Sequence, residues 1–219
     1  MDGNIVQPYI TEFIRNLIPE HEGLLKDLET FAKENRVPIV SPEVGQLLST
    51  VVEMKKPERI LEVGTAIGYS ALLMSAAAPN AEITTLELRD EWADIAEDNF
   101  QKAGKNERIK VIRGNAVETL KDLEGPYDFI FLDAAKGQYL EFYEQSMRML
   151  KSDGIIFSDN VLYRGMVASR ALLIRRKITI VKRLQKYLKQ LSVDKRLTSA
   201  ILSVGDGVAI SYRKGGQDE

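Results

Sequence analysis

The chain has 219 residues, a length that suits one α/β domain, and its 44% hydrophobic and 28% charged residues are ordinary for a globular protein. It has no cysteine, which excludes disulfides, thiol nucleophiles and thiolate metal sites, and its formal net charge of −2 gives no overall attraction to nucleic acid. No apolar run approaches the roughly 20 residues that span a bilayer, and residues 1–4 lack the pattern of a signal peptide. We therefore expect a cytoplasmic protein without a membrane partner.

Residues 5–54 are expected to form three helices. Pro19 ends the first, and Ser41 followed by Pro42 is a typical start for the third. The only histidine, His21, lies in the polar break between the first two helices. We expect it at the surface, without a catalytic role.

Strands and helices then alternate, which predicts a parallel, doubly wound sheet. The expected strands cover residues 59–63, 82–87, 108–113, 127–132 and 154–158, and the expected helices cover 68–78, 90–103, 116–123 and 138–150. A further helix is expected near 169–191. Two last strands, 197–204 and 208–212, flank Gly205-Asp206-Gly207, a hairpin pattern that predicts an antiparallel end to the sheet. The predicted organisation is one domain, 1–219, with a helical part (1–55), a core (56–213) and a disordered tail (214–219).

The first strand runs into a tight turn and a helix. The phosphate-binding pattern G-x-G-x-x-G requires glycine at positions 64, 66 and 69. This chain has Gly64, Ala66 and Tyr69 there, so two of the three glycines are missing. The helix start at Gly68 still offers free N–H groups to a carboxylate. Glu87 closes the next strand, 19 residues after Gly68, where an acid typically binds ribose hydroxyls; an ordinary charged strand end is the alternative. A ligand with adenosine and an amino-acid carboxylate fits, which predicts S-adenosylmethionine.

Polar side chains also follow the fourth and fifth predicted strands. Asp133, Asp159 and Asn160 are expected on one rim, because the carboxyl ends of parallel strands lie at the same edge of the sheet. Their oxygens favour Mg²⁺ or Ca²⁺, although Asp159-Asn160 is also typical of a turn or cap. Lys136 lies three residues after Asp133 and is either a general base or a solvated lysine.

Four motifs in this order resemble the metal-dependent class I O-methyltransferases of the catechol and caffeoyl-CoA type. They are Leu61-Glu62-Val63-Gly64-Thr65-Ala66-Ile67-Gly68-Tyr69-Ser70, Asp133-Ala134-Ala135-Lys136, Ser158-Asp159-Asn160-Val161-Leu162 and Val204-Gly205-Asp206-Gly207. The resemblance runs from about residue 37 to residue 212. It implies a seven-stranded, mostly parallel Rossmann-like sheet with an antiparallel last strand, preceded by N-terminal helices.

The resemblance also implies the site residues. S-adenosylmethionine would contact Val40, Glu62, Gly64, Ser70, Glu87, Gly114, Asn115, Ala116 and Asp133; Mg²⁺ or another divalent metal would bind Asp133, Asp159 and Asn160; and Lys136 and Asp133 would be catalytic. Two positions depart from the family: Asn115, where many members carry Asp, and Ala135, where plant members carry an acid. Because the family often dimerises, we expect a homodimer formed through the N-terminal helices.

The sequence is compatible with two classes of methyl acceptor. Strings such as Val37-Pro38-Ile39 and the basic stretch 170–196 resemble bacterial enzymes that methylate 5-hydroxyuridine at the tRNA wobble position to 5-methoxyuridine. The anticodon loop would then dock on Lys182, Lys186 and Lys189, unless these residues only form a solvated helix surface. The alternative acceptor is a small catechol, another vicinal diol or a caffeoyl-CoA-like molecule. A nucleotide-binding module without catalysis is a third interpretation.

Overall fold

The structure, a computed structural model, describes residues 5–215. Residues 1–4, which bear on the expected lack of a signal peptide, and residues 216–219 of the expected tail lie outside this range. Within it, no helix is both long enough and apolar enough to cross a membrane.

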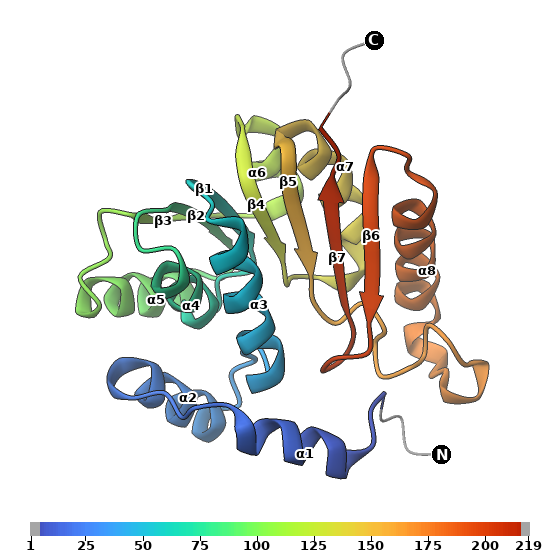
Figure 1. The fold of residues 1–219 in the computed structure, drawn as a ribbon, viewed down its shortest axis with the longest axis horizontal. Coiled ribbons are helices and arrows are strands. Elements are labelled where there is room, and N and C mark those ends of the chain that lie inside the picture. Colours follow the sequence, from blue (N-terminus) through green and yellow to red (C-terminus); the bar gives the residue numbers. More distant parts are fainter. Residues whose placement is uncertain (1–4, 216–219) are drawn as a thin grey trace.

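A seven-stranded sheet organises the molecule (Figure 1). Its strands are β1 (Arg59–Val63), β2 (Glu82–Glu87), β3 (Ile109–Arg113), β4 (Tyr127–Leu132), β5 (Leu150–Ser158), β6 (Leu197–Leu202) and β7 (Val208–Arg213), in the order β3-β2-β1-β4-β5-β7-β6. Strand β7 is antiparallel to both of its neighbours, β5 and β6, whereas β1 to β5 pair in parallel. The predicted fold class, including the reversed last strand, is confirmed.

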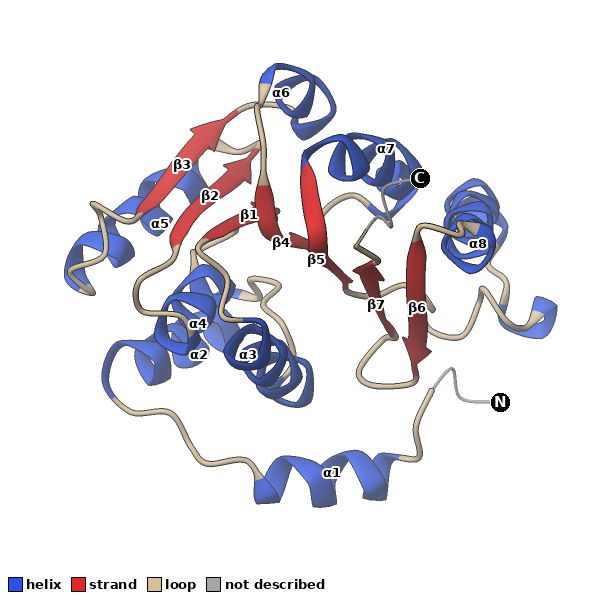
Figure 2. Cartoon of the chain, turned by 45° about the horizontal axis from the view of Figure 1, so that its top comes forward, coloured by secondary structure: helices blue, strands red, loops and turns tan. Residues whose placement is uncertain are grey.

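Helices cover both faces of the sheet (Figure 2). They are α1 (Pro8–Leu17), α2 (Gly23–Asn35), α3 (Pro42–Lys55), α4 (Tyr69–Ala77), α5 (Asp90–Lys102), α6 (Ala116–Asp122), α7 (Tyr139–Met149) and α8 (Ile178–Val193). One core lies between the sheet and α2 to α5, and a second core lies under α6, α7 and α8. Phe129 and Phe131 of β4 lie in the first core, and Ile130 and Leu132 lie in the second. Because β4 is buried on both faces, its sequence is a nearly continuous apolar run.

Two element boundaries differ from the prediction by more than two residues. The helix expected near 169–191 begins only at Ile178, after two short 3₁₀ turns, Arg170–Leu172 and Arg175–Lys177. No side chain caps the start of α8, since Lys177 occupies the N-cap without a hydrogen bond to the helix. Strand β5 begins four residues earlier than expected, at Leu150, because Leu150 pairs with Tyr127 ahead of a register shift in the β4–β5 ladder.

Helix α1 is attached to the rest of the protein mainly through α3. None of its residues is buried, and its tertiary contacts are mainly with α3. The Arg15 side chain donates two hydrogen bonds to the Glu43 carboxylate at the start of α3, at 2.7 and 3.0 Å. This ion pair joins α1 to the rest of the protein.

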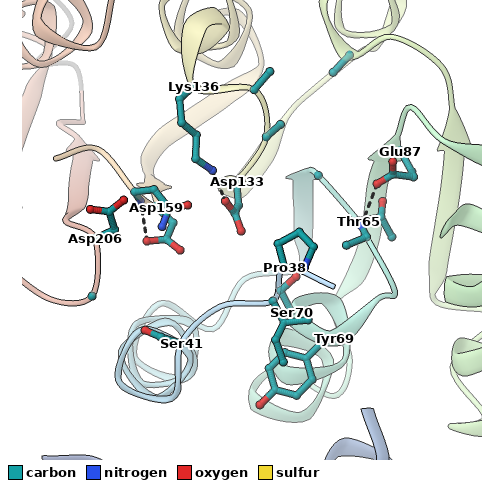
Figure 3. Close-up of a pocket in the computed structure, with 18 of the residues that line it drawn as sticks. Pro38, Ser41, Thr65, Tyr69, Ser70, Glu87, Asp133, Lys136, Asp159 and Asp206 are labelled. Carbon is teal, nitrogen blue, oxygen red and sulfur yellow. Dashed lines mark hydrogen bonds and ion pairs between the residues drawn. The ribbon is translucent and has the colours of Figure 1, made fainter. Parts of the chain in front are cut away.

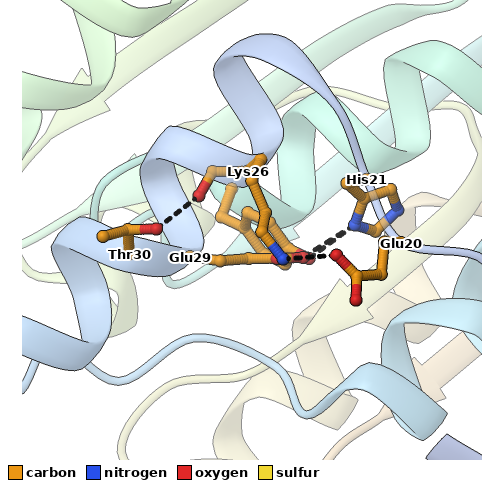
Figure 4. A network of polar contacts seen from close by, with 6 residues as sticks. Glu20, His21, Lys26, Glu29 and Thr30 are labelled. Atoms are coloured by element: carbon orange, nitrogen blue, oxygen red, sulfur yellow. Dashed lines mark hydrogen bonds and ion pairs between the residues drawn. The ribbon is translucent and has the colours of Figure 1, made fainter. Parts of the chain in front are cut away.

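His21 is less exposed than predicted. Its Nδ1 lies 2.7 Å from Glu29 Oε1 on α2, and the Tyr69 hydroxyl at the start of α4 donates to the same oxygen at 2.7 Å. Figure 4 shows His21 beside Glu29, with the Lys26–Glu20 pair next to it. The His21 side chain is 32% exposed and does not line the main cavity, so the contact ties α2 to α4.

Candidate active site

A cavity of about 980 Å³ opens at the carboxyl ends of β1, β2, β4 and β5, on the side where the strand-end acids lie (Figure 3). Its wall also includes residues from α1, the start of α3 and the β6–β7 turn. Ten residues of the predicted sites line it: Gly64, Ser70, Glu87, Gly114, Asn115, Ala116, Asp133, Lys136, Asp159 and Asn160. The structure therefore brings most of the predicted residues together.

Glu87 is fixed by the turn after β1. Its two carboxylate oxygens accept hydrogen bonds from the backbone N–H groups of Ala66 and Arg89, each at 2.9 Å. The side chain is therefore oriented before any ligand arrives, and each oxygen keeps a further acceptor position for a hydroxyl donor.

Glu62 lies behind this wall rather than in it. It is fully buried, and the Ser70 and Thr85 hydroxyls each donate to its carboxyl group at 2.5 Å. Burial raises the pKa of Glu62 to about 8, although the two hydroxyls oppose this shift and the nearby negative charges of Asp133 and Glu87 add to it. Glu62 thus holds the Ser70 hydroxyl in place at the start of α4 through this hydrogen bond.

Two other residues predicted to contact the cofactor also have structural roles within the protein. The Val40 side chain is buried in the core between the sheet and α2 to α5, and Val40 is not part of the cavity wall. Asn115 lines the cavity, but its Oδ1 accepts a hydrogen bond from Val117 N at 3.0 Å and caps α6. Its amide nitrogen and one further acceptor position on Oδ1 are left to meet a ligand.

Gly64 brings the turn after β1 against the end of β4. Its φ of +108° favours glycine, and a Cβ at this position would lie 2.2 Å from the backbone oxygen of Asp133. Asp133 N donates in turn to Val63 O at 2.9 Å. The turn expected to hold the cofactor and the first expected metal ligand are therefore in direct backbone contact.

The rim at the other side of the cavity is acidic. Asp133, Asp159 and Asp206 follow one another across Figure 3, with the Lys136 ammonium 2.6 Å from Asp133 Oδ1. Asp159 is 2% exposed, and burial together with the charge of Asp133 raises its pKa to about 7. Among residues 5–215 no three His, Cys, Asp or Glu side chains cluster closely enough to hold a metal, so a metal here would need the predicted Asn160 amide as well.

Sequence reasoning missed several cavity residues. The sequence places Asp206 in a hairpin turn and in one of the family motifs but does not predict it as a cavity residue. Arg15, Arg164 and the pair Arg89–Trp92, whose guanidinium carbon lies 4.2 Å from the indole ring centre, carried no motif at all. The basic stretch 170–196 contributes nothing to the cavity wall.

The fold and the site define a class of protein. A parallel sheet of this order with a reversed β7, and an acid-ended β2 beside a tight β1–α4 turn, form the Rossmann-like methyltransferase fold. A family model described as O-methyltransferase matches residues 17–214. The chain belongs to the O-methyltransferase family, and its prediction as an O-methyltransferase enzyme is confirmed.

Individual relatives and solved structures also support membership of the O-methyltransferase family. A catechol O-methyltransferase from Niastella koreensis is 32% identical over 75% of this chain and 78% of its own, and a caffeoyl-CoA O-methyltransferase from Stellaria longipes is 31% identical over 90% and 86%. A candidate caffeoyl-CoA O-methyltransferase structure from Staphylococcus aureus has a TM-score of 0.86 and 31% identity, covering 94% of this chain and 99% of that one. An SAH-bound Podospora anserina methyltransferase has a TM-score of 0.84 and 29% identity, covering 94% of each chain.

Proposed function

We propose that the protein transfers the methyl group of S-adenosylmethionine to one hydroxyl of a small catechol or another vicinal diol, with a divalent metal at the rim. The observation that carries this proposal is the cavity itself, in which Glu87 and Thr65 lie on one side and Asp133, Asp159 and Lys136 on the other. The relatives named for catechol and caffeoyl-CoA support this acceptor class.

The cofactor side of the cavity fits S-adenosylmethionine. Glu87 would accept the ribose hydroxyls, and the start of α4 at Tyr69 and Ser70 would present N–H groups to the carboxylate. When bound, the cofactor supplies a methyl group on a sulfonium. The SAH-bound relative supports this ligand.

The acidic rim fits a divalent metal. Asp159 is buried next to Asp133, and two carboxylates in one low-dielectric place repel each other unless a cation lies between them. Asp133, Asp159 and Asn160 would hold the ion, with the hard oxygen ligands that Mg²⁺ prefers. Bound there, it would make an acceptor hydroxyl more acidic.

In this proposal Lys136 accepts the proton, and the cavity wall aligns the two bound molecules. Nζ of Lys136 is held at the rim by Asp133 Oδ1, 2.6 Å away, where in its neutral form it can accept the acceptor's hydroxyl proton. The fixed turn of Gly64 and the fixed Glu87 carboxylate align donor and acceptor, and such alignment supplies much of the acceleration in a transfer between two bound molecules.

The test is turnover of catechol with labelled S-adenosylmethionine and Mg²⁺. We expect a monomethylated product, and we expect Lys136→Met to lower kcat far more than it changes the KM for the cofactor. Unchanged kcat in that variant would reject Lys136 as the base. Absence of product from every vicinal diol would reject the acceptor class.

A second candidate acceptor is 5-hydroxyuridine in the tRNA anticodon loop, with magnesium-dependent methylation as a tRNA-processing step. One observation favours it: the α8 residues Lys182, Lys186 and Lys189 are exposed, while Val181, Leu184, Leu188 and Leu191 are buried against the domain. Cations on an outward face can bind phosphates. Mass spectrometry of tRNA nucleosides after incubation with the enzyme decides between the two acceptors, and a triple alanine variant of Arg175, Arg176 and Lys177 should then raise only the tRNA KM.

We also propose that the protein is a homodimer formed through α1. Tyr9, Phe13 and Leu17 are 65–69% exposed on this helix, a concentration of apolar surface that water disfavours. Sedimentation analysis should give twice the monomer mass of 24.6 kDa, and Phe13→Asp should shift it toward the monomer. A monomer at all concentrations would reject the dimer.

A further inference from the structure

A buried tyrosine lies directly behind the acidic rim. Tyr139, the first residue of α7, is fully buried, and its hydroxyl lies 3.0 Å from Leu132 O at the end of β4 and 2.8 Å from Asp159 O just after β5. A phenol has one proton to donate, so the two carbonyl oxygens share it. Tyr139 is not part of the cavity wall, so any effect on a bound molecule must pass through these partners.

The two carbonyl groups belong to the peptide units that flank the expected metal ligands. The Leu132 carbonyl is joined to the nitrogen of Asp133, and the Asp159 carbonyl is joined to the nitrogen of Asn160. Because a peptide unit is planar, a contact that fixes its oxygen also fixes the direction in which the next residue continues. One hydroxyl therefore orients the main chain at all three expected ligands, Asp133, Asp159 and Asn160.

The chain after β5 needs such support. Asn160 has a φ of 56°, a left-handed conformation that is unfavourable for a residue with a side chain. The peptide unit before it is held on both sides, since Asn160 N donates to Asp159 Oδ1 at 2.6 Å and Asp159 O accepts from Tyr139. Asp159 N in turn donates to Leu132 O at 3.0 Å, so this oxygen serves both Asp159 and Tyr139. These contacts tie the turn after β5 to the end of β4.

The Tyr139 ring is itself fixed by its neighbours. It packs edge to face against Tyr187 of α8, with ring centres 5.5 Å apart and an angle of 89° between the planes. The Tyr187 hydroxyl lies 2.6 Å from Ser158 Oγ, which holds this second ring in place. A hydroxyl on a ring packed in this way has little freedom, so it can keep the ends of β4 and β5 at one spacing.

We propose that Tyr139 is a positioning residue for the divalent metal and that its hydroxyl sets the spacing of the Asp133 and Asp159 carboxylates. The inference rests on the proposed function, since it concerns the metal of that same reaction. Two carboxylates at close range repel each other, and this repulsion favours separation of the two strand ends. A hydroxyl that contacts both peptide units opposes the separation before an ion arrives. A site arranged in advance binds more tightly, because less conformational freedom is lost on binding.

The experiment measures metal binding without turnover. Mn²⁺ takes oxygen ligands as Mg²⁺ does, and its electron paramagnetic resonance signal reports the free ion during a titration with the enzyme. Tyr139→Phe keeps the ring and removes only the hydroxyl. We expect it to raise the Kd of Mn²⁺ about tenfold or more, the usual effect of losing a group that orients a metal ligand. In turnover of catechol, half-maximal rate should need about tenfold more Mg²⁺, with little change in kcat at saturating metal.

Tyr187→Phe is the matched control. Tyr187 is also fully buried and also loses one hydrogen bond, but its partner is the Ser158 side chain and not the main chain beside an expected ligand. We expect the two variants to lose thermal stability to a similar extent, measured by circular dichroism, and only Tyr139→Phe to lose metal affinity.

Equal Mn²⁺ affinity in wild type and Tyr139→Phe overturns the inference and leaves the proposed function intact. A loss of equal size in Tyr187→Phe overturns it too, because general loosening of the core would then be the cause. A lower kcat at unchanged metal affinity also overturns it. If wild type binds no Mn²⁺, the metal proposed for the reaction and this inference fail together. If only Tyr139→Phe loses metal affinity and no diol is methylated, the proposed acceptor fails and the inference stands.

Discussion

The guanidinium of Arg15 on α1 and the carboxylate of Glu43 on α3 form a two-point ion pair, at 2.7 and 3.0 Å, across the mouth of the cavity. The Glu43 side chain is 7% exposed and that of Arg15 46% exposed, so the pair is anchored on the α3 side. Because α1 buries none of its own side chains in the described chain, we expect this pair to be a main attachment of α1 to α3.

We expect Arg15→Met to loosen α1. A partly exposed ion pair contributes up to about 1 kcal/mol, so hydrogen exchange of the α1 amides should speed up several-fold, measured by mass spectrometry. Lys26→Met, which breaks the exposed pair with Glu20, is the control and should leave α1 unchanged. Equal protection of α1 in both variants would contradict the anchoring role of Arg15.

Glu87→Ala should weaken S-adenosylmethionine binding by several-fold to a hundredfold, since a hydrogen bond to a charged group contributes about 1.5–3 kcal/mol. The loss of affinity has two sources. The ribose loses its contact with the carboxylate, and the backbone donors Ala66 N and Arg89 N lose their acceptor. Titration calorimetry measures it. Glu91→Ala, an exposed acid of the same region that only pairs with Arg89, should bind the cofactor as wild type does. Unchanged affinity in Glu87→Ala would remove the ribose assignment.

Chelation should abolish turnover, and Mg²⁺ should restore it. Asp159→Asn should lower kcat by about a hundredfold or more while the protein keeps its fold and most of its affinity for the cofactor. Asp153→Asn is the control, because Asp153 lies on the same strand β5 but pairs with Lys55 away from the cavity. Full activity in chelator, with the metal content checked by elemental analysis, would contradict the metal proposal.

Stability should fall as the pH rises, in part because of Glu62. Its pKa moves from the usual 4.5 to about 8 in the folded protein, where burial disfavours the charged form. The folded state therefore binds the proton more tightly than the unfolded chain does; the contribution is complete below about pH 4.5 and is lost as the pH rises through about 8. Urea denaturation between pH 5 and pH 9 should show a smaller decline for Glu62→Gln than for wild type. Identical declines would contradict the assignment.

Gly64→Ala should destabilise the protein much more than Gly104→Ala. Both glycines have positive φ, at 108° and 66°, but a Cβ at Gly104 meets no atom within 4 Å, whereas at Gly64 it would meet the Asp133 backbone oxygen at 2.2 Å. We expect about 1 kcal/mol for Gly104→Ala and several for Gly64→Ala, measured by denaturant unfolding. Equal costs would mean that the contact between the two strand ends relaxes freely.

The central sheet could be predicted because its strands carry local signals. β4 is a continuous apolar run, and β1 ends in the glycine turn that starts α4, so length and periodicity place both. The rim of Asp133, Asp159 and Asn160 followed from topology, since neighbouring parallel strands must end at one edge. The reversed β7 followed from the Gly205-Asp206-Gly207 turn.

The features of the fold and the site that the sequence does not predict depend on contacts between distant segments. The periodicity of Phe13 and Leu17 predicts a helix but not that its apolar side chains stay exposed, because that is decided by where α1 lies. Asn115 shows the same limit: its sequence position is compatible with a ligand contact and with a helix cap, and only the structure shows the cap. Arg164 enters the cavity through a loop conformation held by Asp206, 42 residues away in the chain.

The contact between Gly64 and the Asp133 backbone has a consequence for how the enzyme can change over evolution. In the proposed function, the methyl-donor pocket and the acidic rim share this piece of main chain, so we expect that the spacing between donor and acceptor cannot be adjusted on one side alone. We expect variation in the acceptor to come instead from the surrounding segments, α1 and the loop bearing Arg164, neither of which belongs to the parallel strands. Exchange of these two segments would then admit new acceptors while the distance over which the methyl group travels stays the same.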